Sequence, residues 1–256
     1  MSGLRISGAT KRYGDKTVVS GLSLTVGPGI VAGLVGPNGC GKTTTLRLIA
    51  GLTTPDEGSI SVSGYDTGAF PLDAKRNLGF VPDTHSGFEQ LTVREYLELY
   101  RNLYRQPHAR YEERAGIMLE AFGLLEHAED SLGVLSHGIR RKVATTAALS
   151  LDVPTILIDE PTVGLDPEGV VVLRRLVRHI GTAGSAVLLA TQDLTFAEHV
   201  CDHLFLIHDG RLVADGSPAC LRERYRVSSI EETFLAVTGM ERRIDDFERR
   251  LDAFSR

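Results

Sequence analysis

Residues 30–43 read IVAGLVGPNGCGKT, and this stretch decides the fold. Ile30–Val35 is a continuous run of apolar and small residues, which is typical of a strand buried on both faces of a sheet. The next residues, 36–43, match the pattern G-x-x-x-x-G-K-[ST], and a helix is predicted from about Lys42 to Ala50. The order strand, glycine-rich loop, helix predicts a phosphate-binding loop.

The chemistry of this loop suits a nucleotide. Backbone amides at a helix N-terminus favour phosphate oxygens, Lys42 can place its ammonium on the outer phosphates, and Thr43 can offer its hydroxyl to Mg²⁺. Cys40 has two interpretations: an ATP-protected thiol that the surrounding amides shift toward thiolate, or a small residue that fills space. The loop residues predicted to hold the nucleotide are Gly36, Pro37, Asn38, Gly39, Cys40, Gly41, Lys42, Thr43 and Thr44.

A second apolar run, Thr155–Ile158, ends in the acidic pair Asp159 and Glu160. Asp159 is predicted to lie on the Mg²⁺ side, and Glu160 to polarise the attacking water. Two solvated acids at a strand end are the alternative, but the phosphate loop favours the catalytic interpretation. Lys42 and Glu160 are therefore predicted to be catalytic.

The remaining patterns predict an α/β fold with a P-loop core of mainly parallel sheet. Alternating N-terminal runs separated by glycine turns predict an antiparallel β subdomain before the loop. Buried strands return after the middle of the chain, and a helix over Glu168–Ile180 separates two of them, which is a βαβ pattern. The N-terminal runs are Leu4–Ile6, Thr17–Val19 and Leu22–Val26, and the later strands are Thr155–Ile158, Ala186–Ala190 and Leu204–Ile207.

The middle of the chain is predicted to be helical. A capping box at 92–95 begins one amphipathic helix, and Gly123 closes a second. We expect an ATPase domain over 1–221, with a helical subdomain at about 86–150, and a C-terminal helical tail over 222–256. In the tail, Ser229 is predicted to cap a short helix. A second tail helix has apolar residues at heptad-like spacing and either docks on its own domain or forms a dimer seam; these are Ile244, Phe247, Leu251 and Phe254.

Composition excludes several classes of protein. The net charge of −5 over 256 residues argues against a nucleic-acid partner. No apolar run approaches the ~18–20 residues that span a bilayer, and the N-terminus lacks the features of a secretory signal. The three cysteines form no disulfide framework and have no metal-ligand spacing, as expected in a reducing cytosol. We therefore expect a cytoplasmic protein that acts at a membrane only through a partner.

These motifs make the chain resemble ABC ATPases over nearly its whole length, and most of all the ABC-2-type exporter branch. Residues 135–138, LSHG, lie where that family has its LSGGQ signature, between the helical insert and the acidic strand end. In the family this segment contacts the γ-phosphate of the nucleotide held by the other protomer, which implies that role for Ser136 and Gly138. Without the resemblance, a plain helix cap is the first interpretation of Ser136.

Two further segments carry the resemblance. Asp166, in Gly164-Leu165-Asp166, matches the family's D-loop, which also faces the nucleotide site. Tyr13 resembles the aromatic side chain that stacks on adenine. Read without the family, these are a helix-entry turn and a hairpin tyrosine.

The chain also departs from the family pattern. Asp83 follows Val-Pro where many members have Gln, and a carboxylate can also serve Mg²⁺ or its waters; the predicted metal ligands are thus Thr43, Asp83 and Asp159. His137 and Ile139 replace Gly and Gln in the signature. Gln192, the third predicted catalytic residue, stands where the family usually has the His that contacts the γ-phosphate, and it can donate a hydrogen bond but cannot carry charge. We expect binding to survive this change and turnover to be affected.

The resemblance implies an ATP-binding, ATP-hydrolysing subunit that uses Mg²⁺, lies on the inner face of the cell membrane and powers export through a separate transmembrane permease. It also implies a second ATPase protomer, either a copy or a paralogue. The alternative, motivated by Gln192, is a nucleotide-gated, weakly hydrolysing partner in a heterodimeric ABC complex. A non-transport ABC ATPase is disfavoured because the chain has a single cassette and a short tail. His199 and His203, four apart on a predicted helix, have no apparent third ligand for a metal.

Overall fold

The computed structural model describes residues 3–83 and 87–240. The predicted second tail helix, with its choice between docking and dimer seam, lies in 241–256, outside the described residues. Within the described part of the chain, no helix is both long and apolar enough to cross a membrane.

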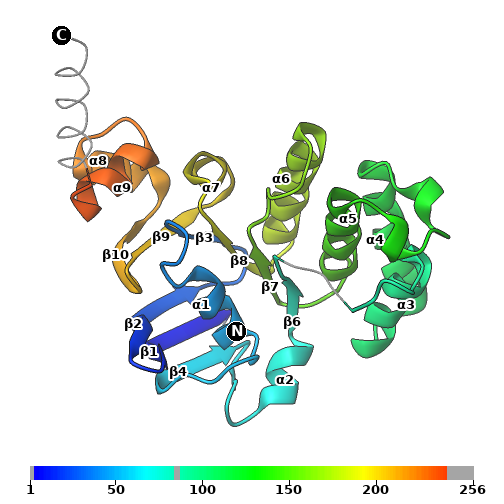
Figure 1. The fold of residues 1–256 in the computed structure, drawn as a ribbon, viewed down its shortest axis with the longest axis horizontal. Coiled ribbons are helices and arrows are strands. Elements are labelled where there is room, and N and C mark those ends of the chain that lie inside the picture. The colour runs from blue at the N-terminus through cyan, green and yellow to red at the C-terminus, as the bar shows by residue number, and fades with distance from the viewer. Residues whose placement is uncertain (1–2, 84–86, 241–256) are drawn as a thin grey trace.

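A six-stranded sheet forms the centre of the molecule (Figure 1). Its order is β10-β9-β3-β8-β7-β6, and every neighbouring pair is parallel except β9 and β10. The three buried strands predicted after the middle of the chain are confirmed. A helix connects the first two of them, as the βαβ pattern predicted. The bounds are β3 Val31–Val35, β6 Leu78–Val81, β7 Thr155–Asp159, β8 Ala186–Thr191, β9 His203–His208, β10 Arg211–Gly216 and the connecting helix α6 Pro167–Thr182.

A four-stranded antiparallel sheet covers one side of this core, as the alternating N-terminal pattern predicted. Its order is β2-β1-β4-β5. Helix α1, which follows the phosphate loop, packs between the two sheets, and Leu46 on it is fully buried in the apolar layer that both sheets share. The bounds are β1 Leu4–Tyr13, β2 Lys16–Val26, α1 Lys42–Ile49, β4 Glu57–Val62, β5 Tyr65–Asp66 and α2 Pro71–Arg76.

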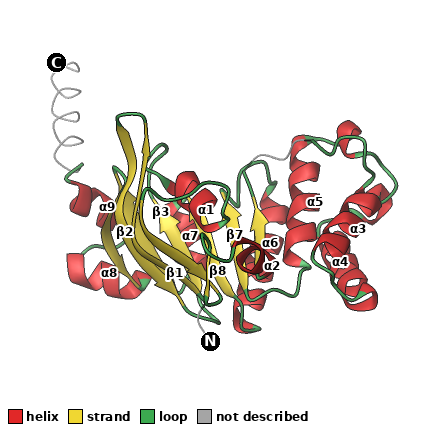
Figure 2. Cartoon of the chain, turned by 90° about the horizontal axis from the view of Figure 1, so that it is seen from below, coloured by secondary structure: helices red, strands yellow, loops and turns green. Residues whose placement is uncertain are grey.

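The helical insert lies at one end of the molecule and the last two described helices at the other (Figures 1 and 2). The predicted capping box is present: Glu95 N donates to Thr92 Oγ1 at 3.2 Å, and Thr92 N donates to Glu95 Oε2 at 2.8 Å. Gly123 has a φ of 69°, the left-handed conformation that ends a helix. The bounds are α3 Val93–Leu103, α4 His108–Ala121, η1 Leu125–His127, η2 Leu132–Val134 and α5 His137–Leu149.

The C-terminal elements are α7 Leu194–Val200, α8 Pro218–Tyr225 and α9 Ile230–Thr238. Ser229 caps α9 as predicted, accepting a hydrogen bond from Glu232 N at 3.1 Å. Helix α8 runs across residue 221 and packs against β10 and α9. The division into 1–221 and 222–256 stays a prediction.

Candidate nucleotide-binding site

The parallel strands end at one edge of the sheet, and a predicted site residue follows each of four of them. The register pairs Val35 with Thr191 and Asp159 with Ala190, so β3, β7 and β8 end side by side. Strand β6 pairs with β7, which places Asp83 just beyond the same edge. In open α/β sheets ligands bind outside the carboxyl ends of the strands, so this edge is the expected site.

A pocket of about 210 Å³ opens at this edge. It gathers residues from the phosphate loop, from the acidic strand end and from the segment after β6, and it adds one residue of β2. The lining residues are Val18, Asn38, Gly39, Gly41, Lys42, Thr43, Thr44, Asp83 and Glu160. Eight of these nine were predicted from the sequence as site residues; Val18 was not.

The loop glycines are required by geometry. Gly41 has a φ of 108°, and a Cβ there would lie 2.6 Å from Val18 O. A Cβ on Gly36 would lie 2.2 Å from Ile207 O. Because neither carbonyl can move without disturbing a strand, only glycine lets the loop follow this path.

Lys42 is held inside its own loop. Its side chain is 5% exposed, and Nζ donates to Gly36 O at 2.8 Å and to Pro37 O at 3.1 Å. The same ammonium forms an ion pair with Glu160 Oε1 at 3.3 Å. Lys42 thus joins the phosphate loop to the acidic strand end.

Glu160 has a strained backbone and a well-fixed side chain. Its φ of 45° is left-handed, which costs of order 1–3 kcal/mol for a residue other than glycine. Its Oε2 accepts from Thr191 Oγ1 and from Gln192 N, both at 3.3 Å. The carboxylate is therefore held between β8 and the phosphate loop, at the wall of the pocket.

Asp159 is fully buried beside the pocket. Burial raises its pKa to about 6, with Asp83 and Glu160 adding to the rise and the Thr43 hydroxyl opposing it. Within residues 3–83 and 87–240, neither carboxylate oxygen has a hydrogen-bond partner of normal geometry. A buried acid with two unsatisfied oxygens, next to a hydroxyl and a second carboxylate, fits a hard divalent cation such as Mg²⁺.

Two sequence interpretations are corrected. The activated-thiol interpretation of Cys40 is wrong, because burial raises the pKa of this thiol and only 4% of the residue is exposed. The side chain fills space against Gly36.

The second correction concerns His199 and His203, which do not share a helix. α7 ends at Val200, His203 begins β9, and no cluster of three metal-ligating side chains occurs in the described residues.

Three of the residues assigned by resemblance, Tyr13, Ser136 and Asp166, do not line this pocket. Tyr13 ends β1 and is half exposed, with Lys11 Nζ 5.6 Å from its ring centre. Ser136 caps α5 by accepting from Ile139 N at 3.3 Å. Asp166 caps α6 and pairs with Lys142 Nζ at 2.9 Å, which lowers its pKa.

The signature segment and the D-loop are packed on each other. A Cβ on Gly138 would lie 2.5 Å from Gly164 O, and a Cβ on Gly164 would lie 3.0 Å from His137 Nδ1. These residues therefore form one surface, separate from the phosphate-loop pocket. Their roles in nucleotide contact stay predictions.

Sequence reasoning missed Arg141, which is 1% exposed. Its guanidinium donates to the carbonyl oxygens of Pro82 and Asp159, and to Glu160 O at 2.8 Å. A signal was present in the pattern: Arg141 falls at helical spacing with the buried Ala144 and Ala148. A basic residue on the apolar face of a helix indicates a buried polar partner.

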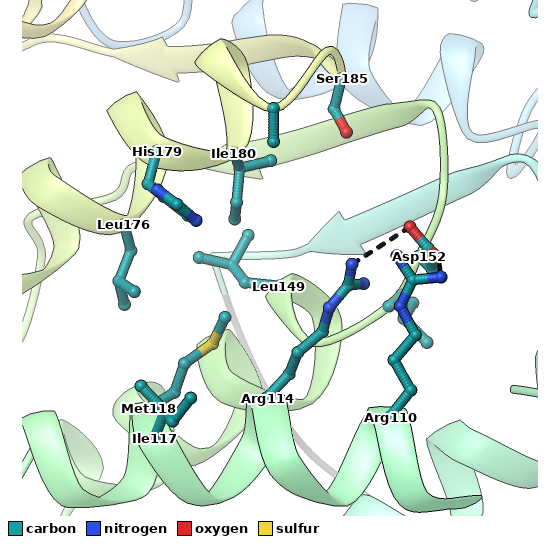
Figure 3. A pocket seen from close by; sticks show the side chains of 12 residues that line it. Arg110, Arg114, Ile117, Met118, Leu149, Asp152, Leu176, His179, Ile180 and Ser185 are labelled. Atoms are coloured by element: carbon teal, nitrogen blue, oxygen red, sulfur yellow. Dashed lines mark hydrogen bonds and ion pairs between the residues drawn. The ribbon is translucent and has the colours of Figure 1, made fainter. Parts of the chain in front are cut away.

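A second cavity, of about 280 Å³, lies between the helical insert and α6 (Figure 3). Arg110 and Arg114 on α4 pair with Asp152, at 2.8 and 3.3 Å, so an ionic contact ties the insert to the loop after α5. Apolar side chains such as Leu149 and Ile180 form its walls. None of the predicted site residues lines it, so this cavity is separate from the candidate nucleotide site.

A glycine loop at the end of a central parallel strand, a lysine within it and an acidic neighbouring strand end define a P-loop nucleotide-binding protein. The profile of the ABC transporter family matches residues 19–163. The chain belongs to this family and is an ATP-binding subunit of an ABC transporter.

Relatives among curated proteins have export or resistance roles in their names. The chain is 36% identical to the Nod factor export ATP-binding protein I of Rhizobium sp. (strain N33), over 90% of this chain and 75% of that protein. It is 34% identical to the linearmycin resistance ATP-binding protein LnrL of Bacillus subtilis (strain 168), over 91% and 77% of the two chains. The resemblance to exporter ATPases is confirmed by these relatives.

Solved structures have the same fold. An ATP-binding subunit of an ABC transporter superposes with a TM-score of 0.88 at 31% identity, covering 93% of this chain and all of the other. The dimeric bacterial ABC transporter cassette MJ0796 superposes with a TM-score of 0.75 at 25% identity, covering 84% and 98%. The predicted P-loop α/β fold, with its antiparallel and helical subdomains, is confirmed.

Proposed function

We propose that the chain hydrolyses Mg·ATP, that it lies on the inner face of the cell membrane, and that hydrolysis powers export through a separate transmembrane permease. The observation that carries the proposal is the convergence of Lys42, Thr43, Asp83, Asp159 and Glu160 at one sheet edge. A cationic side chain, a hydroxyl group and carboxylates are the groups that phosphoryl transfer requires, because positioning and charge neutralisation supply most of its catalysis.

Lys42 and Glu160 act together in this proposal. In the structure they pair with each other, so phosphate entering the loop competes with Glu160 for the Lys42 ammonium. When Lys42 turns to the phosphates, Glu160 is released from the pair while Thr191 and Gln192 still hold its other oxygen. The freed carboxylate oxygen can then orient the attacking water and accept its proton.

Thr43, Asp83 and Asp159 would hold Mg²⁺. The ion would neutralise charge on the phosphate oxygens. Asp159 is the strongest candidate of the three, because its oxygens are buried and unsatisfied. Lys42 and the loop amides would bind the phosphates themselves.

A groove beside the site supports the proposal that the chain binds a membrane partner. It has a volume of about 320 Å³ and runs between α3 and β6. Phe88 is 43% exposed and Leu103 is 65% exposed at its edge, and Pro82 in its wall directly precedes Asp83. A permease segment with an apolar face would cover these side chains and lie next to the catalytic carboxylates.

A second ATPase protomer completes the proposed site. The surface formed by Ser136, Gly138 and Asp166 does not reach the chain's own pocket, but the family arrangement sets it against the nucleotide of the other subunit. The solved structure of the bacterial ABC transporter cassette MJ0796 is dimeric. We propose the same arrangement here, with either a copy of this chain or a paralogue.

The test is steady-state ATPase activity of the purified chain, alone and with a candidate membrane subunit. We expect ATPase activity that needs Mg²⁺, that disappears in Lys42→Ala, and that changes when the membrane protein is added. Absence of Mg²⁺-dependent hydrolysis in both preparations would contradict the catalytic part of the proposal.

The second candidate, a nucleotide-gated subunit that hydrolyses poorly beside an active paralogue, is favoured by Gln192. Its side chain is exposed, and the hydrogen bond that holds it to Glu160 uses its backbone amide. ATP-dependent dimerisation with a paralogue, without turnover by this chain's own site, would select this candidate. The intact Glu160 is the feature that argues for hydrolysis.

A further inference from the structure

Arg141 joins three carbonyl groups that belong to two different strand ends. Its guanidinium donates to Pro82 O after β6, and to Asp159 O and Glu160 O at the end of β7. Pro82 precedes Asp83, so the three accepting residues include or adjoin every carboxylate proposed for the site. One side chain thus joins the two strand ends that carry the proposed catalytic groups.

The charges around Arg141 indicate why an arginine is buried here. Desolvation lowers its pKa, while Asp159, Asp83 and Glu160, in that order, raise it. A buried cation is costly, and a packed apolar side chain would often stabilise a fold as well or better. A buried guanidinium that donates to three main-chain carbonyls at the acidic strand ends therefore indicates a role in the site.

The shape of the guanidinium matters as much as its charge. Its planar fork offers donors in fixed directions, so one group can hold two or more carbonyls at set angles. One of these carbonyls belongs to Glu160, whose left-handed φ of 45° needs the surrounding structure to hold it. Without the fork, the Glu160 backbone can relax and move its carboxylate away from the attacking water.

The helix that carries Arg141 begins at the signature segment. Ser136 caps α5, and Arg141 lies further along the same helix. We propose that Arg141 is a positioning residue for ATP hydrolysis: it holds Glu160 and Asp83 in their working places and ties them to the helix that is proposed to face the other protomer's nucleotide. The inference rests on the proposed hydrolytic function and assigns Arg141 no contact with substrate.

The experiment compares Arg141→Gln and Arg141→Lys with wild type. Arg141→Gln is expected to lower kcat by about tenfold to hundredfold, since small misplacements of catalytic groups cost this much, while KM for ATP changes less than threefold. Arg141→Lys keeps the charge without the fork and is expected to give an intermediate kcat. Melting temperatures and fluorescent-nucleotide titrations establish that the compared proteins are folded and bind ATP.

A matched control is Arg178→Gln on α6. Arg178 also donates to a main-chain carbonyl, Val200 O, and to a carboxylate, Asp202 Oδ1, both at 3.1 Å, but it lies outside the pocket. Its kcat is expected to stay within twofold of wild type. Should Arg141→Gln not fold, Arg141→Lys carries the comparison.

The outcomes separate the inference from the function on which it rests. Wild type that hydrolyses Mg·ATP, with Arg141 variants of equal kcat, would overturn the positioning role alone. A raised KM with unchanged kcat would also overturn it, because that pattern indicates lost binding. Wild type that hydrolyses nothing would overturn the proposed function first, whatever the variants do.

Discussion

Replacing Glu160 by Gln separates the chemistry of this side chain from its packing. In the structure one carboxylate oxygen lies 3.3 Å from Lys42 Nζ, and the other accepts from Thr191 and Gln192. The Gln amide has one acceptor and one donor group. It can therefore keep its contacts with β8, but it cannot keep the ion pair with Lys42.

The substitution is expected to change both the rate of hydrolysis and the affinity for ATP. Loss of a general base typically lowers the rate by about 10²–10⁴-fold, or roughly 3–5 kcal/mol of barrier. ATP affinity is expected to rise, because Lys42 no longer has Glu160 as a competing partner; a charge-assisted contact worth about 1 kcal/mol corresponds to ~fivefold tighter binding. The variant should therefore accumulate as an ATP-bound dimer that does not turn over.

The assays are steady-state ATPase activity, fluorescent-nucleotide titration and size-exclusion chromatography with and without ATP. Glu223→Gln on α8 is the matched control, since it makes the same chemical change at an exposed position away from the pocket. Parental turnover in Glu160→Gln would refute the assignment of the base. Weaker ATP binding in a folded variant would refute the competition between Glu160 and phosphate for Lys42.

Four further predictions test single groups of the site. Lys42→Ala is expected to weaken ATP binding by at least ~100-fold, because charge-assisted hydrogen bonds are worth about 1.5–3 kcal/mol each; unchanged affinity by calorimetry would remove the phosphate-loop role. Burial raises the pKa of Asp159 to about 6 from 3.8, so the ionised group destabilises the metal-free fold above pH 6, and this penalty fades as the pH falls toward 4. Asp159→Asn should therefore stabilise the chain in EDTA by roughly 2–3 kcal/mol at pH 7.5 and by less at pH 5; urea unfolding that shows no gain at pH 7.5 would contradict this. Cys40 should react with maleimide much more slowly than the exposed Cys220, with or without ATP; equal labelling by mass spectrometry would show that the buried thiol is accessible. Gln192→His is expected to raise turnover by about tenfold to hundredfold with little change in ATP affinity, since a charged group facing the γ-phosphate acts mainly in the transition state; equal or lower kcat would show that this position does not limit the enzyme.

Many of the predicted site residues were found from patterns within short, contiguous segments of the sequence. The phosphate loop, its preceding strand and the acidic strand end are contiguous segments, and their glycine spacing and apolar runs reflect constraints that neighbouring residues impose on each other. The capping box at 92–95 and the helix end at Gly123 were predictable for the same reason, because a helix terminus is satisfied by residues within one turn.

The errors came from groups whose environment is set by distant parts of the chain. Cys40 lies in a loop that favours thiolate by its local amides, but packing against the sheets buries it and raises its pKa. His199 and His203 have helical spacing, yet the chain turns from α7 into β9 between them. Burial and chain direction at these positions depend on which strands become neighbours.

The sequence by itself determined the class of fold, the phosphate loop and the identity of the acidic pair, because each is encoded in a short run of residues. Only the tertiary structure decided that β6 lies beside β7, which brings Asp83 into the pocket, and that Lys42 pairs with Glu160. It also revealed Arg141, whose three accepting carbonyls lie on segments far from it in sequence. Strand order and the partners of a buried charge arise from long-range packing, and local spacing indicates at most that such a residue is buried.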